Sequence, residues 1–283
     1  IPAMITHFKI RGKKNWGRSA ALIRRIDEAR AAGIDVTMAQ YPYTAGSTFL
    51  HVVIPPWYHS RGVDGLLRAL REERGAIKHD LDTRMDWENF SQSVGWEKIF
   101  VSSVVSEANQ PCVGKSISQI AAERGHADPA DAAFDLLVEE QLAVGMISFG
   151  LDEADITAIM RHPAVSFITD GLMSGRPHPR AYATYPRILG RYVREQGVLS
   201  LEEAVRKMTS LPARKIRLRN KGVIAEGYDA DLVVFDPDTV IDKNSYDDPR
   251  VHPAGIAHVL VNGVFVVEDA ALTGARPGRV TRD

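Results

Sequence analysis

Hydrophobic residues recur along the chain in short blocks that predict strands and helices in turn. The apolar run of residues 1–8 is typical of a buried strand, and a loop with the sequence RGKKNWG follows it. Residues 20–33 then carry apolar side chains at helical spacing, and Gly33 marks the end of this helix. A second apolar segment covers residues 34–46. Strand, helix and strand in this order predict a parallel βαβ unit.

The pattern changes over residues 54–110, which we interpret as an insertion. This segment opens with consecutive prolines, continues with a charged helix predicted over residues 65–81, and ends in a stretch rich in Trp, Ser and Asn at residues 87–103. None of these parts continues the alternation of strand and helix seen before them. The insertion therefore separates the first βαβ unit from the rest of the body.

Helical patterns return after the insertion and alternate with two apolar segments, VGMISFG and AVSFITDG. Asp128 followed by Pro129 predicts one helix start, and Ser200 with Glu203 three residues later predicts another. The predicted helices cover residues 116–125, 128–143, 152–160, 184–197 and 200–216.

The chain changes character after Arg217. Apolar and polar residues alternate over residues 222–236 and 255–274, and the second segment contains Asn-Gly, a strong hairpin signal. We therefore predict two parts: an α/β body over residues 1–215, with the insertion inside it, and a small β unit over residues 216–283.

Composition excludes several classes of partner. With 45% hydrophobic residues the chain can bury a sizeable core, and its 35 basic and 36 acidic residues nearly cancel. No global charge favours a nucleic acid or an anionic membrane, and no apolar run approaches the roughly 20 residues of a membrane helix. One cysteine, Cys112, cannot form an internal disulfide. These observations predict a cytoplasmic protein without a nucleic-acid or membrane partner.

Five motifs occur in one order: ITHFK with NWGRS, YPYTAGST, ITDG with HPR and YATYPRILGRYVRE, LSLEEAVRKMTSLPA, and GVIAEGYDADLVVFDP. Together they resemble the N-acyl-D-amino-acid deacylases, or D-aminoacylases, of the amidohydrolase superfamily. The resemblance implies a distorted (β/α)8 barrel with a small β-sandwich, and zinc at the carboxyl ends of the strands. The expected fold class is thus the C-terminal part of such a barrel, with an insertion and part of the sandwich.

The resemblance also assigns roles to single residues. It implies that His7 is a zinc ligand and that Asp170 is the catalytic carboxylate and a further metal ligand. By the same comparison, four residues would hold the α-carboxylate of the substrate: Lys9, Tyr41, Ser47 and Arg180.

These residue types suit amide hydrolysis. Zinc lowers the pKa of a bound water toward about 7 and polarises the carbonyl group. A carboxylate such as Asp170 can take the proton of the water and pass it to the leaving nitrogen. Arg180 can clamp a carboxylate with two parallel hydrogen bonds, and Lys9 adds a point charge.

Other motifs of the family lie upstream of the stretch that matches ITHFK and are missing from these 283 residues. The chain also begins with an apolar run that has no element before it. We therefore expect a C-terminal portion of a zinc-dependent amidohydrolase that hydrolyses N-acyl-D-amino acids. An N-terminal complement of the same enzyme, or a second subunit, would supply the remaining zinc ligands, because one histidine does not make a zinc site.

Simpler roles stay open for each residue. His7 could be a hydrogen-bonded structural histidine, and Asp170 before Gly171 could cap a turn. Arg180 could form a surface ion pair. Lys9 could be solvated, and Tyr41 and Ser47 could serve packing and a turn. Two other functions also stay open: hydrolysis of cyclic amides, as in hydantoinases and dihydropyrimidinases, and a noncatalytic scaffold subunit without metal.

Overall fold

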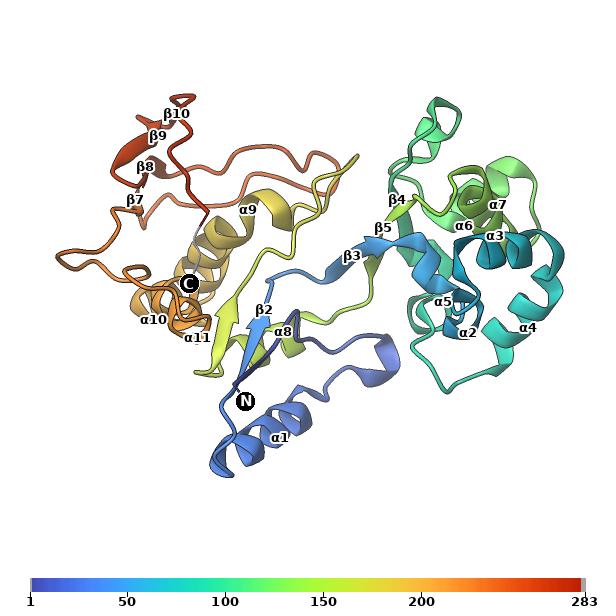
Figure 1. The fold of residues 1–283 in the computed structure, drawn as a ribbon, viewed down its shortest axis with the longest axis horizontal. Helices are drawn as coiled ribbons and strands as arrows, with labels where there is room; N and C mark the ends of the chain where they lie inside the picture. Colours follow the sequence, from blue (N-terminus) through green and yellow to red (C-terminus); the bar gives the residue numbers. More distant parts are fainter. Residues whose placement is uncertain (1, 281–283) are drawn as a thin grey trace.

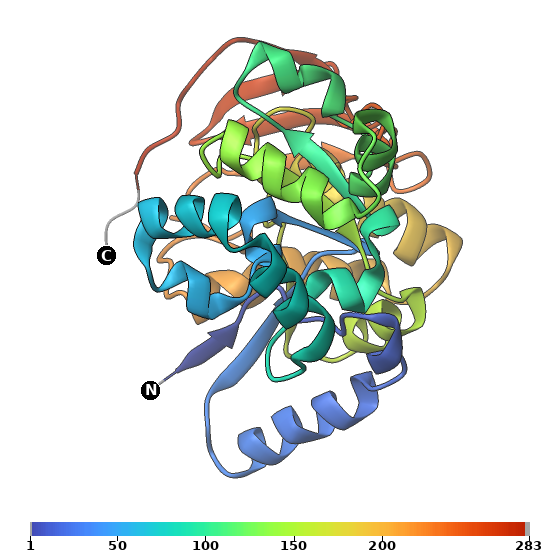
Figure 2. The same ribbon diagram turned by 90° about the vertical axis from the view of Figure 1, so that its right-hand side faces the viewer.

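The computed structural model describes residues 2–280 and contains three separate sheets. Figures 1 and 2 show a mixed body, a mainly helical unit on one side of it, and a C-terminal sheet at the end opposite α1. The helical unit joins the body through the long segments that contain β3 and β5 (Figure 1).

Three parallel strands form the sheet of the body, in the order β1-β2-β6. Ile5 pairs with Met38, and Gln40 pairs with Phe167, so the carboxyl ends of the three strands meet at one edge. The sheet and its helices bury a core that includes Met38, Val165 and Phe167. The elements of the body are β1 (Ala3–Ile5), η1 (Lys13–Asn15), α1 (Ser19–Ala31), β2 (Val36–Gln40), α8 (Glu153–Met160), β6 (Val165–Phe167), α9 (Arg180–Arg187), η5 (Ile188–Glu195), α10 (Leu201–Met208) and α11 (Ser210–Lys215).

The buried strand predicted over residues 1–8 is wrong in length and in burial, as far as the described residues show; Ile1 lies outside them. The observed strand β1 covers only Ala3–Ile5, and Ile5 is 41% exposed. Within the described residues β1 pairs with β2 alone, so it forms an edge of the sheet and its side chains lack a second covering layer. A periodicity of apolar residues cannot distinguish an edge strand from a central one.

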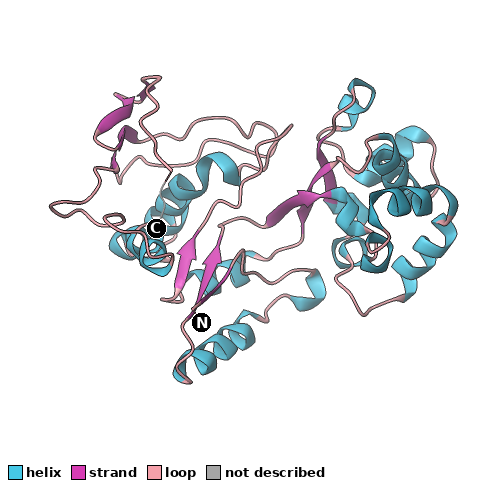
Figure 3. Ribbon diagram, viewed as in Figure 1, coloured by secondary structure: helices cyan, strands magenta, loops and turns pink. Residues whose placement is uncertain are grey.

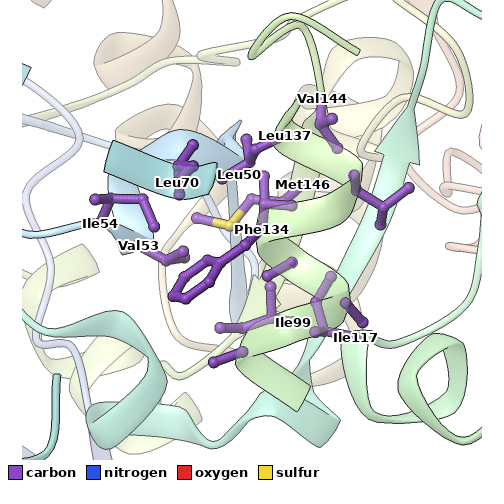
Figure 4. Close-up of a cluster of buried hydrophobic side chains, with 14 of the residues drawn as sticks. Leu50, Val53, Ile54, Leu70, Ile99, Ile117, Phe134, Leu137, Val144 and Met146 are labelled. Carbon is purple, nitrogen blue, oxygen red and sulfur yellow. The ribbon is translucent and has the colours of Figure 1, made fainter. Parts of the chain in front are cut away.

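The helical unit contains a second, antiparallel sheet in the order β3-β5-β4. Figure 3 shows these strands between the helices of the unit and the body. Figure 4 shows Phe134 among apolar side chains from the helices and strands of this unit, including Leu50, Ile99 and Met146. Its elements are β3 (Ala45–Phe49), η2 (Leu50–Val53), α2 (Pro56–His59), α3 (Gly62–Glu72), α4 (Arg74–Thr83), α5 (Phe90–Val94), η3 (Trp96–Lys98), β4 (Ile99–Ser103), η4 (Glu107–Cys112), α6 (Ile117–Arg124), α7 (Pro129–Glu139) and β5 (Gly145–Phe149).

The single strand predicted over residues 34–46 is two strands in different sheets. β2 ends at Gln40, the chain passes through Pro42, and β3 begins at Ala45. Proline cannot donate a hydrogen bond to a sheet, so it ends the first pairing. The second pairing, with β5, depends on a strand about a hundred residues later and is not encoded locally.

Two predicted helices are broken in the structure. The helix predicted over residues 65–81 breaks at Glu73, whose φ and ψ are −117° and 23°, and the Arg74 side chain donates to the carbonyl oxygen of Leu70 at 2.8 Å. The helix predicted over residues 200–216 breaks at Thr209 (φ −126°, ψ −85°). Pro212 lacks the N–H that a continuous helix would need at that point.

Predicted helix starts and the C-terminal hairpin are confirmed. Ala130 N donates to Asp128 Oδ1 at 2.9 Å, and Glu203 N donates to Ser200 Oγ at 3.2 Å. The Asn-Gly turn joins β8 to β9 in an antiparallel sheet of order β10-β9-β8-β7. Its strands are β7 (Leu232–Phe235), β8 (Ile256–Val261), β9 (Val264–Glu268) and β10 (Ala271–Leu272). The boundary placed at residues 215 and 216 stays a prediction.

Glu140 anchors the loop after β4 to the end of α7. Its carboxylate accepts hydrogen bonds from Val105 N at 2.6 Å, from Asn109 Nδ2 at 2.7 Å, and from both the N–H and the hydroxyl of Ser106. Burial opposes ionisation, but the hydrogen bonds from Ser106 and Asn109 outweigh it and lower the pKa of Glu140 from 4.5 to about 2.

Glu140→Gln is expected to lower the free energy of unfolding by about 2 kcal/mol at neutral pH, because a charge-assisted acceptor is lost. Because the pKa is lower in the folded state, the contribution is present above the unfolded pKa and disappears as the pH falls from 4.5 to about 2. Urea unfolding at several pH values checks this. Glu139→Gln, at an exposed pair with Arg124, is the control and should cost less than about 1 kcal/mol. A pH-independent difference for Glu140→Gln would contradict the prediction.

Candidate active site

Three of the predicted functional residues follow the carboxyl ends of the three parallel strands. His7 lies just beyond β1, Tyr41 directly follows β2, and Asp170 lies three residues after β6. His7 and Asp170 both have left-handed backbone conformations, with φ of 41° and 49°. Such angles are uncommon for residues other than glycine and cluster at functional positions. The edge of the sheet thus holds an imidazole and a carboxylate, each on a residue with this uncommon backbone conformation.

Lys9 turns back onto His7. Its ammonium group donates to the carbonyl oxygen of His7 at 2.6 Å and lies 2.9 Å from Nδ1 of the same residue. The ammonium also lies 5.6 Å from the centre of the Tyr41 ring. Lys9 therefore joins the residues that follow β1 and β2.

Arg180 joins the residues that follow β2 and β6. Its side chain is 1% exposed, Nη1 lies 2.9 Å from Asp170 Oδ2, and Nη2 donates to the carbonyl oxygen of Ser47 at 3.1 Å. The guanidinium carbon lies 4.4 Å from the centre of the Tyr41 ring. A buried guanidinium held by a carboxylate and an aromatic face is rigid, so Asp170 has a fixed partner.

Electrostatic interactions connect the residues around Lys9 with those around Arg180. Burial, and then the nearby charge of Arg11, lower the pKa of Lys9 to about 8, while the negative charge of Asp170 opposes this shift. Burial also raises the pKa of Tyr41, and Arg180 opposes that shift. Asp170 thus lies close enough to Lys9 to interact with it, and Lys9 touches His7.

His178 fixes the backbone at the start of α9. The ring is fully buried, Nδ1 accepts a hydrogen bond from Arg180 N at 3.0 Å, and Nε2 donates to the carbonyl oxygen of Ala45 at 3.1 Å. Burial and then Arg180 hold the pKa of His178 well below its ordinary value, so the ring is neutral. His178 is not among the six residues predicted for the site, because the sequence alone left it open between a role beside the substrate and a structural role in a loop. Its position two residues before Arg180 is the signal in the sequence that points to it.

The structure brings five of the six predicted residues together through their side chains: His7, Lys9, Tyr41, Asp170 and Arg180. Ser47 takes part through its backbone carbonyl oxygen, which Arg180 contacts. The possibility of a surface ion pair at Arg180 is wrong, because this side chain is among the most buried of the chain. The chemical roles of the six residues stay predictions.

The donors at the sheet edge meet part of the needs of a zinc ion. Imidazole nitrogen and carboxylate oxygen are ordinary zinc ligands, and the sheet edge offers one of each, His7 and Asp170. Within residues 2–280 no group of three or more His, Cys, Asp and Glu side chains is placed to hold a metal ion. Structural and catalytic zinc sites usually take three or four protein ligands. The two donors fit part of a zinc site.

Comparisons with known proteins identify the family. Residues 110–267, more than half of the chain, match the amidohydrolase family. The chain therefore belongs to the amidohydrolase family.

Individual relatives are deacylases of N-acyl-D-amino acids. The chain is 39% identical over 280 residues to N-acyl-D-glutamate deacylase, and 36% identical over 281 residues to D-aminoacylase, both of Alcaligenes xylosoxydans xylosoxydans. These matches cover 99% of this chain and 48% of each relative. The chain thus spans about half the length of the curated relatives it matches.

A solved structure supports the fold. The crystal structure of N-acyl-D-glutamate deacylase from Bordetella bronchiseptica, complexed with zinc and a phosphonate mimic of the tetrahedral intermediate, matches with a TM-score of 0.78 at 34% identity. The match covers 100% of this chain and 50% of that chain. The predicted fold class and the predicted resemblance to N-acyl-D-amino-acid deacylases are confirmed.

Proposed function

We propose that this chain provides the substrate-binding and proton-transfer residues of a zinc-dependent hydrolase of N-acyl-D-amino acids. The observation that carries the proposal is the contact between the buried guanidinium of Arg180 and the carboxylate of Asp170 at the strand edge that also holds His7 and Lys9. The similarity to deacylases of N-acyl-D-amino acids supports the choice of reaction.

The substrate is proposed to bind through its α-carboxylate. Lys9, in the loop after β1, and Arg180, at the start of α9, present two positive charges, and the Tyr41 ring lies against both. Arg180 supplies directional donors, while Lys9 supplies a compact charge. A free carboxylate also distinguishes these substrates from cyclic amides such as hydantoins, which present none. Ser47 lies beside this group on β3 and is included in the binding set.

Asp170 is proposed as the general base and acid. It would accept a proton from the attacking water and return it to the nitrogen of the broken amide bond. Its contact with Arg180 holds the carboxylate in one orientation, so the group need not reorganise during the reaction. A zinc ion held by His7 and Asp170 would lower the pKa of the water and polarise the carbonyl group of the substrate.

The remaining zinc ligands are proposed to come from polypeptide other than these 283 residues, as an N-terminal complement of the same enzyme or a second subunit. Two observations support this: the chain spans about half the length of its relatives, and the described residues supply fewer than three clustered ligands.

No helix in the described part of the chain is long and apolar enough to cross a membrane. The cytoplasm is proposed as the compartment, because Cys112 is the single cysteine. Neither a nucleic acid nor a membrane is proposed as a partner.

The function is tested on the purified protein together with the proposed complement. Zinc is supplied, and the release of free amino acid is measured. We expect hydrolysis of N-acetyl-D-glutamate and N-acetyl-D-methionine, little hydrolysis of the L-enantiomers, and none of hydantoin. Loss of activity with a chelator and recovery with zinc would connect the reaction to the metal. Hydantoin as the preferred substrate would favour the cyclic-amide alternative. A folded, complemented preparation that binds no zinc would favour the scaffold.

A further inference from the structure

A cavity of about 580 Å³ lies between the start of α1 and the loop before α5. Five cationic side chains line it, and a single carboxylate, Glu88, is found among the lining residues. The cations are Lys9, Arg11, Lys14, Arg18 and Arg25. We call this space, lined by these five cations, the basic cavity. So many like charges around one space favour the entry of an anion.

Ion pairs within the protein do not neutralise these charges. Arg11 Nε and Glu88 Oε1 are 3.7 Å apart, and the Glu88 side chain is 67% exposed, so this pairing is weak. Among the ion pairs of residues 2–280, none involves Lys14, Arg18 or Arg25. Arg24, the neighbour of Arg25 on α1, instead reaches Glu28 at 3.8 Å. The positive charge of the basic cavity is therefore available to a ligand.

Arg11 is a rigid anchor at the basic cavity. Its side chain is 11% exposed, its guanidinium carbon lies 3.5 Å from the centre of the Phe90 ring, and Nη2 donates to Ser148 Oγ at 2.5 Å. Its Nε is buried and has no hydrogen-bond partner among the described residues, so Arg11 contributes its charge to the cavity rather than this donor. A fixed guanidinium loses little entropy when an anion binds.

Most neutral donors of the basic cavity are already engaged, and Trp87 Nε1 is buried without a hydrogen-bond partner among the described residues. Asn15 Nδ2 donates to the carbonyl oxygen of Arg11 at 2.8 Å, and Gln92 Nε2 donates to that of Leu81 at 2.5 Å. Leu22 and Met85 add apolar surface to the lining. The free groups are thus cations beside an apolar wall, and the volume lies in the range of small-molecule sites.

We infer that the basic cavity binds a small organic anion that carries at least two negative charges, as phosphate or carboxylate groups, beside an apolar part. The cations come from the segment of residues 9–25, while the opposite wall comes from the segment of residues 85–93. A bound anion would therefore hold the helical unit against α1. Lys9 also belongs to the proposed active site, whereas the other four cations do not. The inference depends on these four and does not rest on the proposed function.

Calorimetric titration of the purified protein tests the inference at an ionic strength of about 0.15 M, where unspecific attraction is screened. The probes are ADP, phenylsuccinate, pyrophosphate and adenosine. We expect saturable binding of ADP or phenylsuccinate with one molecule per chain, weaker binding of pyrophosphate, which lacks an apolar part, and none of adenosine. Preference for ADP over phenylsuccinate would indicate phosphate, and the reverse would indicate carboxylate. Absence of saturable binding for all three anions would overturn the inference.

Variants locate the site. The double variant Arg18→Gln and Arg25→Gln changes two exposed side chains and should weaken binding by roughly tenfold or more, with Arg24→Gln on the same helix as the matched control. Arg11→Met should weaken it further, provided that its circular dichroism matches the wild type. The double variant should hydrolyse N-acetyl-D-glutamate at a rate within about twofold of the wild type, because neither arginine belongs to the proposed active site, and this separates the test from that of the proposed function. Unchanged binding in the double variant, or an equal loss in Arg24→Gln, would refute the basic cavity as the site.

Discussion

Asp170→Asn is expected to reduce the turnover number for N-acyl-D-amino acids by about 10²- to 10⁴-fold, the usual contribution of a positioned general base. The amide is nearly the same size as the carboxylate and can still contact Arg180, so the fold should persist. It cannot accept a proton from water at neutral pH. The measurement is steady-state hydrolysis of N-acetyl-D-glutamate, together with the zinc content of the same preparation.

We expect zinc to remain bound to Asp170→Asn, because an amide oxygen and His7 can still contribute as ligands. The matched control is Asp64→Asn, at an exposed position in the first turn of α3. It should change the turnover number less than twofold, within the small effect of a helix-end charge. Undiminished activity of Asp170→Asn would remove this residue from the mechanism, whereas loss of zinc with loss of activity would make it chiefly a ligand.

Arg180→Met is expected to be the most destabilising change at the site. The side chain is 1% exposed and pairs with Asp170 at 2.9 Å, so its removal leaves the carboxylate without its partner. Breaking such a pair costs roughly 3 kcal/mol of unfolding free energy, and the Asp170 side chain, 36% exposed, keeps the cost at the low end of the known range. Chemical denaturation gives the unfolding free energy.

Two further variants separate charge from geometry at this position. Arg180→Lys keeps the charge but loses the planar fork, so it should fold better than Arg180→Met and still raise KM for N-acyl-D-amino acids by roughly tenfold. Arg24→Met is the control, because Arg24 and Glu28 are both largely exposed and their pairing is worth less than about 1 kcal/mol. Equal stability of Arg180→Met and the wild type would mean that the pair with Asp170 does not support the fold.

The elements that sequence analysis predicted best are those with local signals. Asp128 and Ser200 cap helices as expected, because a cap depends on residues two or three positions away. The Asn-Gly turn between β8 and β9 has φ of 49° and 77° at its two residues, angles that few other residue pairs adopt. These features are encoded over a few residues.

The elements that sequence analysis predicted poorly depend on distant partners. The edge position of β1 follows from which strands pair with it in space. The separate sheet of β3, β5 and β4 follows from pairing between segments about a hundred and about fifty residues apart. Lys207 is fully buried and donates to the carbonyl oxygens of Met160 and Val165, a position that its charged type does not predict.

The sequence by itself determined the first strand-helix-strand unit of the body, two helix starts, the hairpin near the C-terminus and the candidate residues at the ends of strands. These depend on short-range periodicity, turn chemistry and motifs. Only the tertiary structure decided that Arg180 is buried against Asp170, that His178 holds its backbone, and that Arg11 joins other cations around one cavity. The physical reason is that burial and electrostatic pairing arise between residues far apart in the chain, whose approach no local pattern specifies.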